Sequence, residues 1–431
     1  MSTNSLNWLS TQSQSYQPLK VKHSSLILAL IILMFIGDAA NTVLLKTGSS
    51  FWRVSIFVRI LALLYFTLLL IKVPQGRNLL KILIILLATF LIGAFSTYMT
   101  ENHYEWFENI NIMTKMIFFF VCWQTFRLYF KSPSERSWLF KVFEFLILIQ
   151  LLSILIGFIF DIDLFHSYSS FKRFGYKGLI PARNELSGFL LISFFYFVWK
   201  VKTYGRGVLS LFLVLISGLL TGSKVAISLP IIFTLLLGYW SLIRNKRYVF
   251  FIVLFMFLVF FTLVIWQWDY ILQLITPTIN YFKQQLAYGH NPSLLSIFFS
   301  GRDLLVKNLL NDLHSNLNLV TMFFGGHELS KLSSETDLID TFLFIGLLGT
   351  MIFYIFYIKT LLYCEGKRGF IQLLFVITWL IVSTFAGHLV FSAINSSYLA
   401  ILVLAFSRHE TGKNVQIRLS NASHLPQLGC S

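Results

Sequence analysis

Three carboxylates stand directly before a long apolar run in SSETDLIDTFLFIGLLGT, residues 333–350, and they are the side chains best placed to do chemistry. Ser334 and Asp337 have the spacing of a helix capping motif, which predicts a helix beginning near Glu335 whose positive end attracts acids. This accounts for Asp337, but Asp340 lies one turn further along, where a carboxylate in an apolar helix is costly. A carboxylate at such a boundary can also take a proton from a hydroxyl group, and we predict this general-base role for Glu335. Asp337 and Asp340 are predicted to orient the hydroxyl-bearing substrate.

Arginines supply the complementary charge. In KRFGYKGLIPARNELSGF, residues 172–189, Arg173 and Arg183 flank a turn containing glycine and proline, and Asn184 and Glu185 begin the next apolar run. An arginine guanidinium suits a pyrophosphate because it is planar, permanently charged and donates paired hydrogen bonds. Arginines at a membrane interface also extend toward lipid head groups, so both interpretations stay open for each of them. We predict that these four residues belong to the binding site of an anionic substrate.

The long connection 268–337 carries the remaining candidates. Its stretch PSLLSIFFSGRDLLVKNLL, residues 292–310, has leucine and phenylalanine at the spacing of an amphipathic helix lying on a membrane surface, with Arg302 on the polar side. Arg302 is therefore a further predicted anion ligand. His314 is a reserve candidate for the base, although a single histidine in such a loop is more often an ordinary polar packing residue.

The composition identifies the class of protein that must position these side chains. Of the 431 residues, 56% are hydrophobic and 12% are charged, which is typical of a chain that crosses a membrane many times. The net charge of +16 does not indicate nucleic-acid binding, because the basic residues are scattered between apolar runs. The spacing of histidine, cysteine and acidic residues matches no metal site, and no glycine-rich phosphate loop is visible, so we expect neither a metal nor a cofactor.

Apolar runs of about 17–25 residues are long enough to cross a bilayer. The sequence predicts twelve of them, at 24–45, 51–71, 79–99, 112–130, 139–160, 185–200, 207–222, 225–243, 247–267, 338–360, 369–388 and 390–407. Basic residues lie in every second connection, which places both termini in the cytoplasm.

We therefore predict an all-α polytopic membrane protein with about 12 transmembrane helices. It has a cytoplasmic leader (1–23), a transmembrane catalytic domain (24–407) and a cytoplasmic tail (408–431). One large outward-facing loop, 268–337, connects the ninth and tenth predicted helices.

This order of features resembles the superfamily of O-antigen ligases and Wzy-type polysaccharide polymerases of bacterial envelopes. Ligases of the superfamily carry a histidine and a small polar residue, then nine residues, then Gly-x-x-Gly, Thr or Tyr. In this chain Gly346-Leu-Leu-Gly349 matches the second half, and Glu335-Thr336 occupies the place of the histidine pair. A carboxylate at that place is more similar to the polymerase branch.

Two further segments bear on the resemblance. His314-Ser315 also stands nine residues before a glycine, Gly325, but that register ends on Glu328 and no apolar run follows directly. The stretch RFGYKGLIPARNEL is similar to the segment between an arginine and an asparagine that precedes a mid-chain helix in the superfamily. We therefore prefer Glu335 as the counterpart of the histidine.

The resemblance implies a GT-C-like glycosyltransferase in the bacterial inner membrane, with its large loop in the periplasm. It would join undecaprenyl-pyrophosphate-linked oligosaccharide repeat units into O-antigen, capsule or exopolysaccharide at the periplasmic face. The implied partners are this lipid-linked substrate, membrane lipids and a chain-length regulator protein, and no nucleic acid. An O-antigen ligase of the same fold is the first alternative, and a lipid-linked oligosaccharide flippase is a more distant one.

Overall fold

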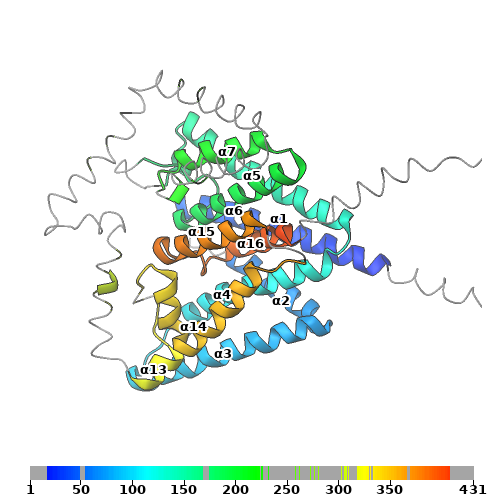
Figure 1. The fold of residues 1–431 in the computed structure, drawn as a ribbon. Helices are drawn as coiled ribbons and strands as arrows, with labels where there is room; N and C mark the ends of the chain where they lie inside the picture. Colours follow the sequence, from blue (N-terminus) through cyan, green and yellow to red (C-terminus); the bar gives the residue numbers. More distant parts are fainter. Residues whose placement is uncertain are drawn as a thin grey trace, which may run out of the picture.

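The computed structural model describes residues 17–48, 54–167, 174–223, 318–329, 333–365 and 369–407, with isolated positions between 225 and 309 and at 331. Within these residues the chain is helical, apart from turns, loops and one antiparallel bridge between His166 and Tyr176. The predicted all-α class is therefore confirmed for the described part of the chain. Figure 1 shows the helices packed side by side in one bundle, with α5 and α7 at its upper edge and α3 at its lower edge.

The helices follow one another with short connections through most of the described chain. In order they are α1 (Gln17–Lys46), α2 (Val54–Ile71), α3 (Pro74–Glu101), α4 (Trp106–Tyr129), α5 (Pro133–Ile159), the 3-10 turn η1 (Asp163–Phe165), α6 (Arg183–Tyr204), α7 (Val208–Leu220), α13 (Leu319–Phe324), α14 (Asp337–Leu361), α15 (Phe370–Ala386) and α16 (Ala393–Phe406).

Local sequence signals set several of these boundaries. Helix α5 begins at Pro133, where the missing N–H is not needed, and Ser132 and Glu135 form a reciprocal capping box around it. Helix α6 ends at Gly205, whose left-handed conformation (φ 68°) closes the last turn. Such signals lie at the polar edges of apolar runs, which is why the boundaries could be approximated from the sequence.

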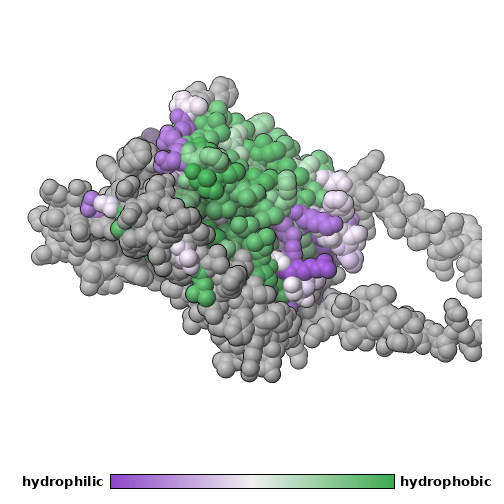
Figure 2. Space-filling view, turned by 90° about the horizontal axis from the view of Figure 1, so that it is seen from above, coloured by the Kyte–Doolittle hydropathy of each residue, from purple (hydrophilic) through white to green (hydrophobic). Residues whose placement is uncertain are grey.

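The apolar surface of the bundle is that of a membrane protein. Among the described helices, six are long and apolar enough to cross a bilayer: α1 from His23, α2, α3, α5, α6 and α14. Figure 2 shows the hydrophobic residues gathered in a continuous belt, with hydrophilic groups on either side of it. Large apolar side chains of α2 and α3, such as Phe57 and Ile84, are exposed on the bundle, as a lipid-facing surface requires.

Most of the predicted spans coincide with helices. The first seven match α1 to α7, and the last three match α14 to α16. The predicted spans at 225–243 and 247–267, and most of the loop 268–337, lie outside the described residues. The predicted boundary between the last two spans needs correction, because residues 387–392 form a non-helical loop in which Gly387 and His388 both have positive φ.

Helices α6 and α16 form the centre of the bundle. Helix α6 is buried along nearly its whole length, and every residue of α16 is buried. Helix α16 packs against α4 and α6, while α2 packs against α1, α3 and α4. A helix that is apolar all round belongs in such a core.

Contacts between distant segments define the two ends of the bundle. At one end, Lys46 at the close of α1 pairs with Asp163 after α5 (3.0 Å). At the other, the Arg127 guanidinium near the end of α4 lies 4.2 Å from the centre of the Tyr363 ring, just after α14. The first end, where α1, α3 and α5 finish and α2, α4, α6, α14 and α16 begin, is called the site end below and lies toward the left in Figure 1. In the predicted topology it faces outward.

Candidate functional site

The first turn of α14 buries Asp337 against the loop that precedes α16. Its Oδ2 accepts hydrogen bonds from the backbone N–H groups of Leu389 and Val390, both at 2.9 Å. Its Oδ1 has no hydrogen-bond partner in the described part of the chain. Asp337 therefore ties α14 to the loop before α16 through two backbone hydrogen bonds, which is more than the helix-end role that its position in the sequence suggested.

Asp340 is buried one turn further along and organises the turn before the helix. Its carboxylate accepts hydrogen bonds from the backbone N–H and the hydroxyl of Ser334, both at 2.7 Å, and from the hydroxyl of Ser333 at 3.0 Å. These bonds replace the water that a buried carboxylate loses, which explains how an apolar helix accommodates it. The protein's own groups thus occupy much of the hydrogen-bonding capacity that was predicted to orient a substrate.

Glu335 is the one carboxylate of the three that remains accessible. Its side chain is 47% exposed, and its Oε2 lies 3.4 Å from Nε of Arg302. The two predicted site residues are therefore brought together, from positions 33 residues apart in the sequence. The backbone of Glu335 has φ 55°, an uncommon conformation for a residue with a side chain. Its carbonyl packs directly on Gly387.

The loop 387–392 connects this acidic turn to the predicted site residues of α6. While Leu389 and Val390 bind Asp337, the hydroxyl of Ser392 donates to Oε1 of Glu185 at 3.0 Å. The loop therefore places the start of α6 and the start of α14 in one region of the site end. The sequence offered a weak signal for it, since Gly387 and His388 interrupt an otherwise apolar run.

Of the other predicted site residues, two lie at the start of α6 and two lie outside the described residues. Arg183 is the first residue of α6 and is exposed, and Asn184 follows it in the first turn with partial exposure. Arg173 and His314 lie outside the described residues. His388 was not predicted, and it lies close enough to Asp340 to act on it electrostatically.

A non-helical segment that follows α13 enters the bundle beside α14. The N–H groups of Gly326 and His327 donate to the carbonyls of Phe344 and Leu343, at 3.0 and 3.2 Å. Helix α14 is kinked just beyond them at Gly346 (φ 69°, ψ −176°), which removes regular helical partners from these carbonyls. Backbone groups away from water need such partners, so the kink and the inserted segment depend on each other.

Glycines make this insertion possible because the backbones touch. A Cβ atom on Gly346 would stand 2.3 Å from the backbone of Phe323, and one on Gly326 would stand 2.2 Å from that of Gly93 in α3. Gly346, which entered the sequence analysis only as part of a motif, is therefore the point where α14 bends around the inserted segment.

The inserted segment is fastened to the α3–α4 turn by Glu328. This buried carboxylate accepts from the Glu105 N–H at 2.8 Å and pairs with the Lys331 ammonium at 2.6 Å. Its hydrogen bond raises the pKa of Lys331. Burial, together with the charge of Glu328, raises the pKa of Tyr104 well above its ordinary value. Burial also lowers the pKa of His327, so this imidazole is kept neutral near pH 7.

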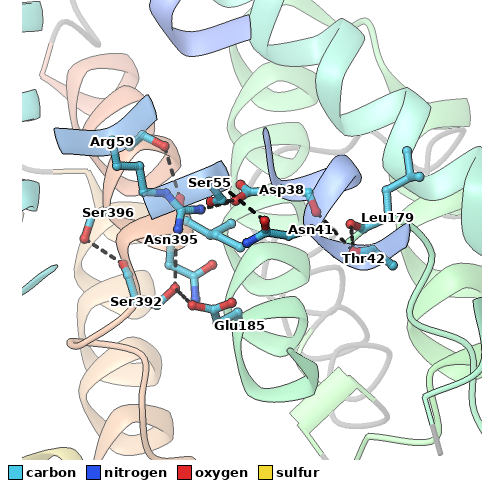
Figure 3. Close-up of polar contacts among 12 residues, drawn as sticks. Asp38, Asn41, Thr42, Ser55, Arg59, Leu179, Glu185, Ser392, Asn395 and Ser396 are labelled. Atoms are coloured by element: carbon cyan, nitrogen blue, oxygen red, sulfur yellow. Dashed lines mark hydrogen bonds and ion pairs between the residues drawn. The ribbon is translucent and has the colours of Figure 1, made fainter. Parts of the chain in front are cut away.

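A second polar cluster lies deeper in the bundle and was missed as a site by the sequence analysis. Asp38 of α1 is buried and accepts from the hydroxyl of Ser55 and the guanidinium of Arg59, both on α2. Asn41 accepts from the Ser55 N–H at 3.3 Å. Figure 3 shows this group facing Glu185 of α6 and the first turn of α16. The available signal was the occurrence of charged residues within apolar runs.

No metal centre can be assigned. Over the residues that the structure describes, no group of three or more histidine, cysteine, aspartate and glutamate side chains is arranged to hold a metal ion. At the site end the described residues bring together an exposed carboxylate and a guanidinium, with polar groups of α6 joined to the same loop.

Comparisons with known proteins add no further constraint. No protein-family model, curated protein or solved structure matches this chain. Its function must therefore be inferred from the geometry and the sequence.

Proposed function

We propose that the chain is a GT-C-like glycosyltransferase, a Wzy-type polymerase of the bacterial inner membrane with both termini in the cytoplasm. It would join oligosaccharide repeat units carried on undecaprenyl pyrophosphate at the periplasmic face. The observation that carries the proposal is the pairing of Glu335, the accessible carboxylate, with Arg302 at 3.4 Å. The proposal also rests on the resemblance of the motif around Glu335 and Gly346 to this superfamily.

In the proposed reaction, Glu335 would act on the acceptor and the arginines on the leaving group of the donor. The hydroxyl oxygen of the acceptor attacks the anomeric carbon of the donor sugar, and its proton passes to the Glu335 carboxylate. The bond from the anomeric carbon to the pyrophosphate oxygen breaks, and its electron pair leaves with the lipid pyrophosphate. Arg302, with Arg183 and Arg173 as further candidates, would stabilise the charge on that leaving group. A pyrophosphate needs cations more than it needs a general acid.

Asp337 and Asp340 act in this scheme mainly by positioning. Their hydrogen bonds fix the turn 333–336 to the loop 387–392, and the backbone of Glu335 is held between these two elements. A base on a fixed backbone is kept within reach of the acceptor hydroxyl.

A flippase for lipid-linked oligosaccharides is a second candidate, favoured by one observation. The Asp38–Arg59 pair lies within the helices, as the charged groups of transporters often do. However, the pair joins two neighbouring helices near the site end, while Glu335 and Arg302 lie outside the apolar core, as a transferase site at the membrane surface requires. An O-antigen ligase would share the fold and differ in its acceptor.

A gel of surface polysaccharide from cells lacking this gene separates the three functions. If the protein is a polymerase, cells without the gene are expected to carry a single repeat unit at the surface in place of the ladder of longer chains. The wild-type gene is expected to restore that ladder. Full-length polymer retained on its lipid carrier would make the protein a ligase. Single lipid-linked units trapped on the cytoplasmic side would make it a flippase. In the polymerase case, the protein would also be purified from the complemented cells and examined for a chain-length regulator that co-purifies with it.

A further inference from the structure

Helix α13 carries no charge and exposes most of its apolar side chains. Its sequence is LVTMFF, and the side chain of Leu319 is 74% exposed. Its one polar residue, Thr321, is buried, and its hydroxyl exchanges hydrogen bonds with the backbone of the capping residue Asn318 at 3.2 and 3.1 Å. The other exposed apolar residues of this helix are Val320, Met322 and Phe323. A helix of a loop in water would instead turn its apolar face toward the protein.

The end of α13 lies well inside the bundle, between α3 and α14. A Cβ atom on Gly93 of α3 would stand 2.4 Å from the carbonyl oxygen of Phe324. One on Gly346 of α14 would stand 2.3 Å from the backbone of Phe323. Gly93 is eight residues before the end of α3 and Gly346 is nine residues after the start of α14, which corresponds to about 12 and 14 Å along these helices. Both helices are long and apolar enough to cross a bilayer, so the chain enters between two spans before it returns to the start of α14.

The exposed face of α13 continues the apolar surface of its two neighbours. Figure 1 shows α13 beside α3 and α14 at the lower left of the bundle. Close to the two contact glycines, both neighbours expose large apolar side chains, namely Ile92 and Phe95 on α3 and Leu347 and Leu348 on α14. The face of α13 is therefore continuous with the surface that the spanning helices turn toward lipid.

The backbone of this segment has the arrangement that a lipid environment imposes. The exposed part is helical, whereas the non-helical residues Gly325 and Gly326 that follow it are buried. The N–H of Gly325 donates to the carbonyl of Thr321 at 2.7 Å. The N–H of Gly326 donates to the carbonyl of Phe344 at 3.0 Å. Within a membrane, non-helical backbone is tolerated only where protein covers it, and here α3 and α14 do so.

We propose that α13 binds the acyl chains of membrane lipids, as a re-entrant segment of the loop 268–337 at the site end. Hydrocarbon is the partner that matches a face without charged or exposed polar groups and continuous with the lipid-facing surface. The sequence analysis assigned this whole loop to the outward side of the membrane, and the inference returns residues 319–327 to the bilayer. It goes beyond the proposed function, since it involves neither the donor lipid nor the reaction.

The test is the accessibility of spin labels on the full-length protein in liposomes, measured by electron paramagnetic resonance. Single cysteines replace Leu319 or Phe323, one helical turn apart, in a chain whose three native cysteines are changed to alanine. Oxygen concentrates in hydrocarbon, whereas a polar nickel chelate stays in water, so the two collision rates report the surroundings of each label. Phe95→Cys, on the exposed apolar face of α3, is the lipid control, and Glu101→Cys, at the exposed end of the same helix, is the water control.

The expected result is a ratio of oxygen to nickel collision rates close to that of Phe95→Cys at both α13 positions. This ratio should be about tenfold higher than that of Glu101→Cys, because a polar chelate is excluded from hydrocarbon. Thermal unfolding of each labelled protein shows whether it keeps its fold. If a label at Phe323 disturbs the fold, the more exposed Leu319 position carries the test.

Two other results would overturn the proposal. A ratio equal to that of Glu101→Cys would place α13 in water. Low collision rates with both reagents would show that protein covers the face, whether a second copy of the chain or another partner. Because the measurement requires no substrate, it decides the place of α13 whether or not the chain proves to be a polymerase.

Discussion

Replacing Gly387 by alanine is expected to disable the site by moving Glu335. Gly387 has φ 63° and ψ 160°, a conformation open essentially to glycine alone, and a side chain there costs about 1–3 kcal/mol. The new Cβ atom would also stand 1.9 Å from the Glu335 carbonyl oxygen, where an ordinary contact begins at 3.4 Å. The two backbones must therefore separate by about 1.5 Å, the difference between those values. A displacement of about 1 Å at a reacting group can lower a rate about 100-fold.

The assay compares initial rates of polymerisation and thermal unfolding of the purified protein in detergent. Gly205→Ala is the matched control, because Gly205 also has positive φ (68°) but no atom stands within 4 Å of its added Cβ. The control is expected to lose about 1 kcal/mol of stability and to keep its activity. A folded Gly387→Ala protein with the wild-type rate would refute the positioning of Glu335 by this loop.

Two further predictions concern stability. Arg59→Met leaves the buried Asp38 carboxylate without its counter-ion and is expected to lower the free energy of unfolding by about 3–5 kcal/mol, whereas the Asp38→Asn, Arg59→Met double variant recovers most of it in denaturant titrations. Equal losses in the single and double variants would contradict this. Because burial lowers the pKa of His327 in the folded protein, the unfolded chain binds more protons there, and stability is lost as the pH falls below about 6.5 toward the lowered value. Thermal unfolding between about pH 7 and 5 should show a flatter dependence in His327→Asn, and an unchanged slope would count against the buried neutral imidazole.

The helical class could be predicted because it depends on the hydropathy averaged over long segments of the chain, and not on individual contacts. Runs of apolar residues fix which segments can cross a bilayer, and proline, serine and glycine mark where α5 and α6 begin or end. The interruption at 387–392 was harder to predict, since it depends on backbone contacts of Gly387 and on hydrogen bonds that two loop residues donate to Asp337, 52 and 53 residues earlier in the chain. A local pattern holds no information on such partners.

The candidate site was predictable in its residue types and only partly in their roles. Glu335 and Arg302 were chosen from charge and position, and the structure brings them together. Asp337 and Asp340 were chosen on the same grounds, yet their oxygens bind backbone and serine groups of the protein. Which carboxylate stays accessible depends on the fold of the turn 333–336, and the sequence alone cannot separate three neighbouring acids.

The buried cluster around Asp38 shows a different limit. Single charged residues in apolar runs are visible in a sequence, but their pairing depends on which helices are neighbours. Arg59 is satisfied by Asp38 on the adjacent α1, whereas Lys115 on α4 has no such partner in the described part of the chain. Only the packing of the helices shows which charged residues of apolar runs form ion pairs with each other.

The central claim is that Glu335 activates the acceptor hydroxyl in a transfer reaction at the site end. The most direct measurement reconstitutes the purified protein in liposomes with undecaprenyl-pyrophosphate-linked repeat units and resolves the products on a gel. We expect Glu335→Gln to form no polymer while remaining folded and able to bind the lipid-linked substrate. Glu101→Gln, the same change at an exposed acid of the same end, is expected to polymerise normally. Polymer formed by Glu335→Gln at the wild-type rate would contradict the assignment of the base.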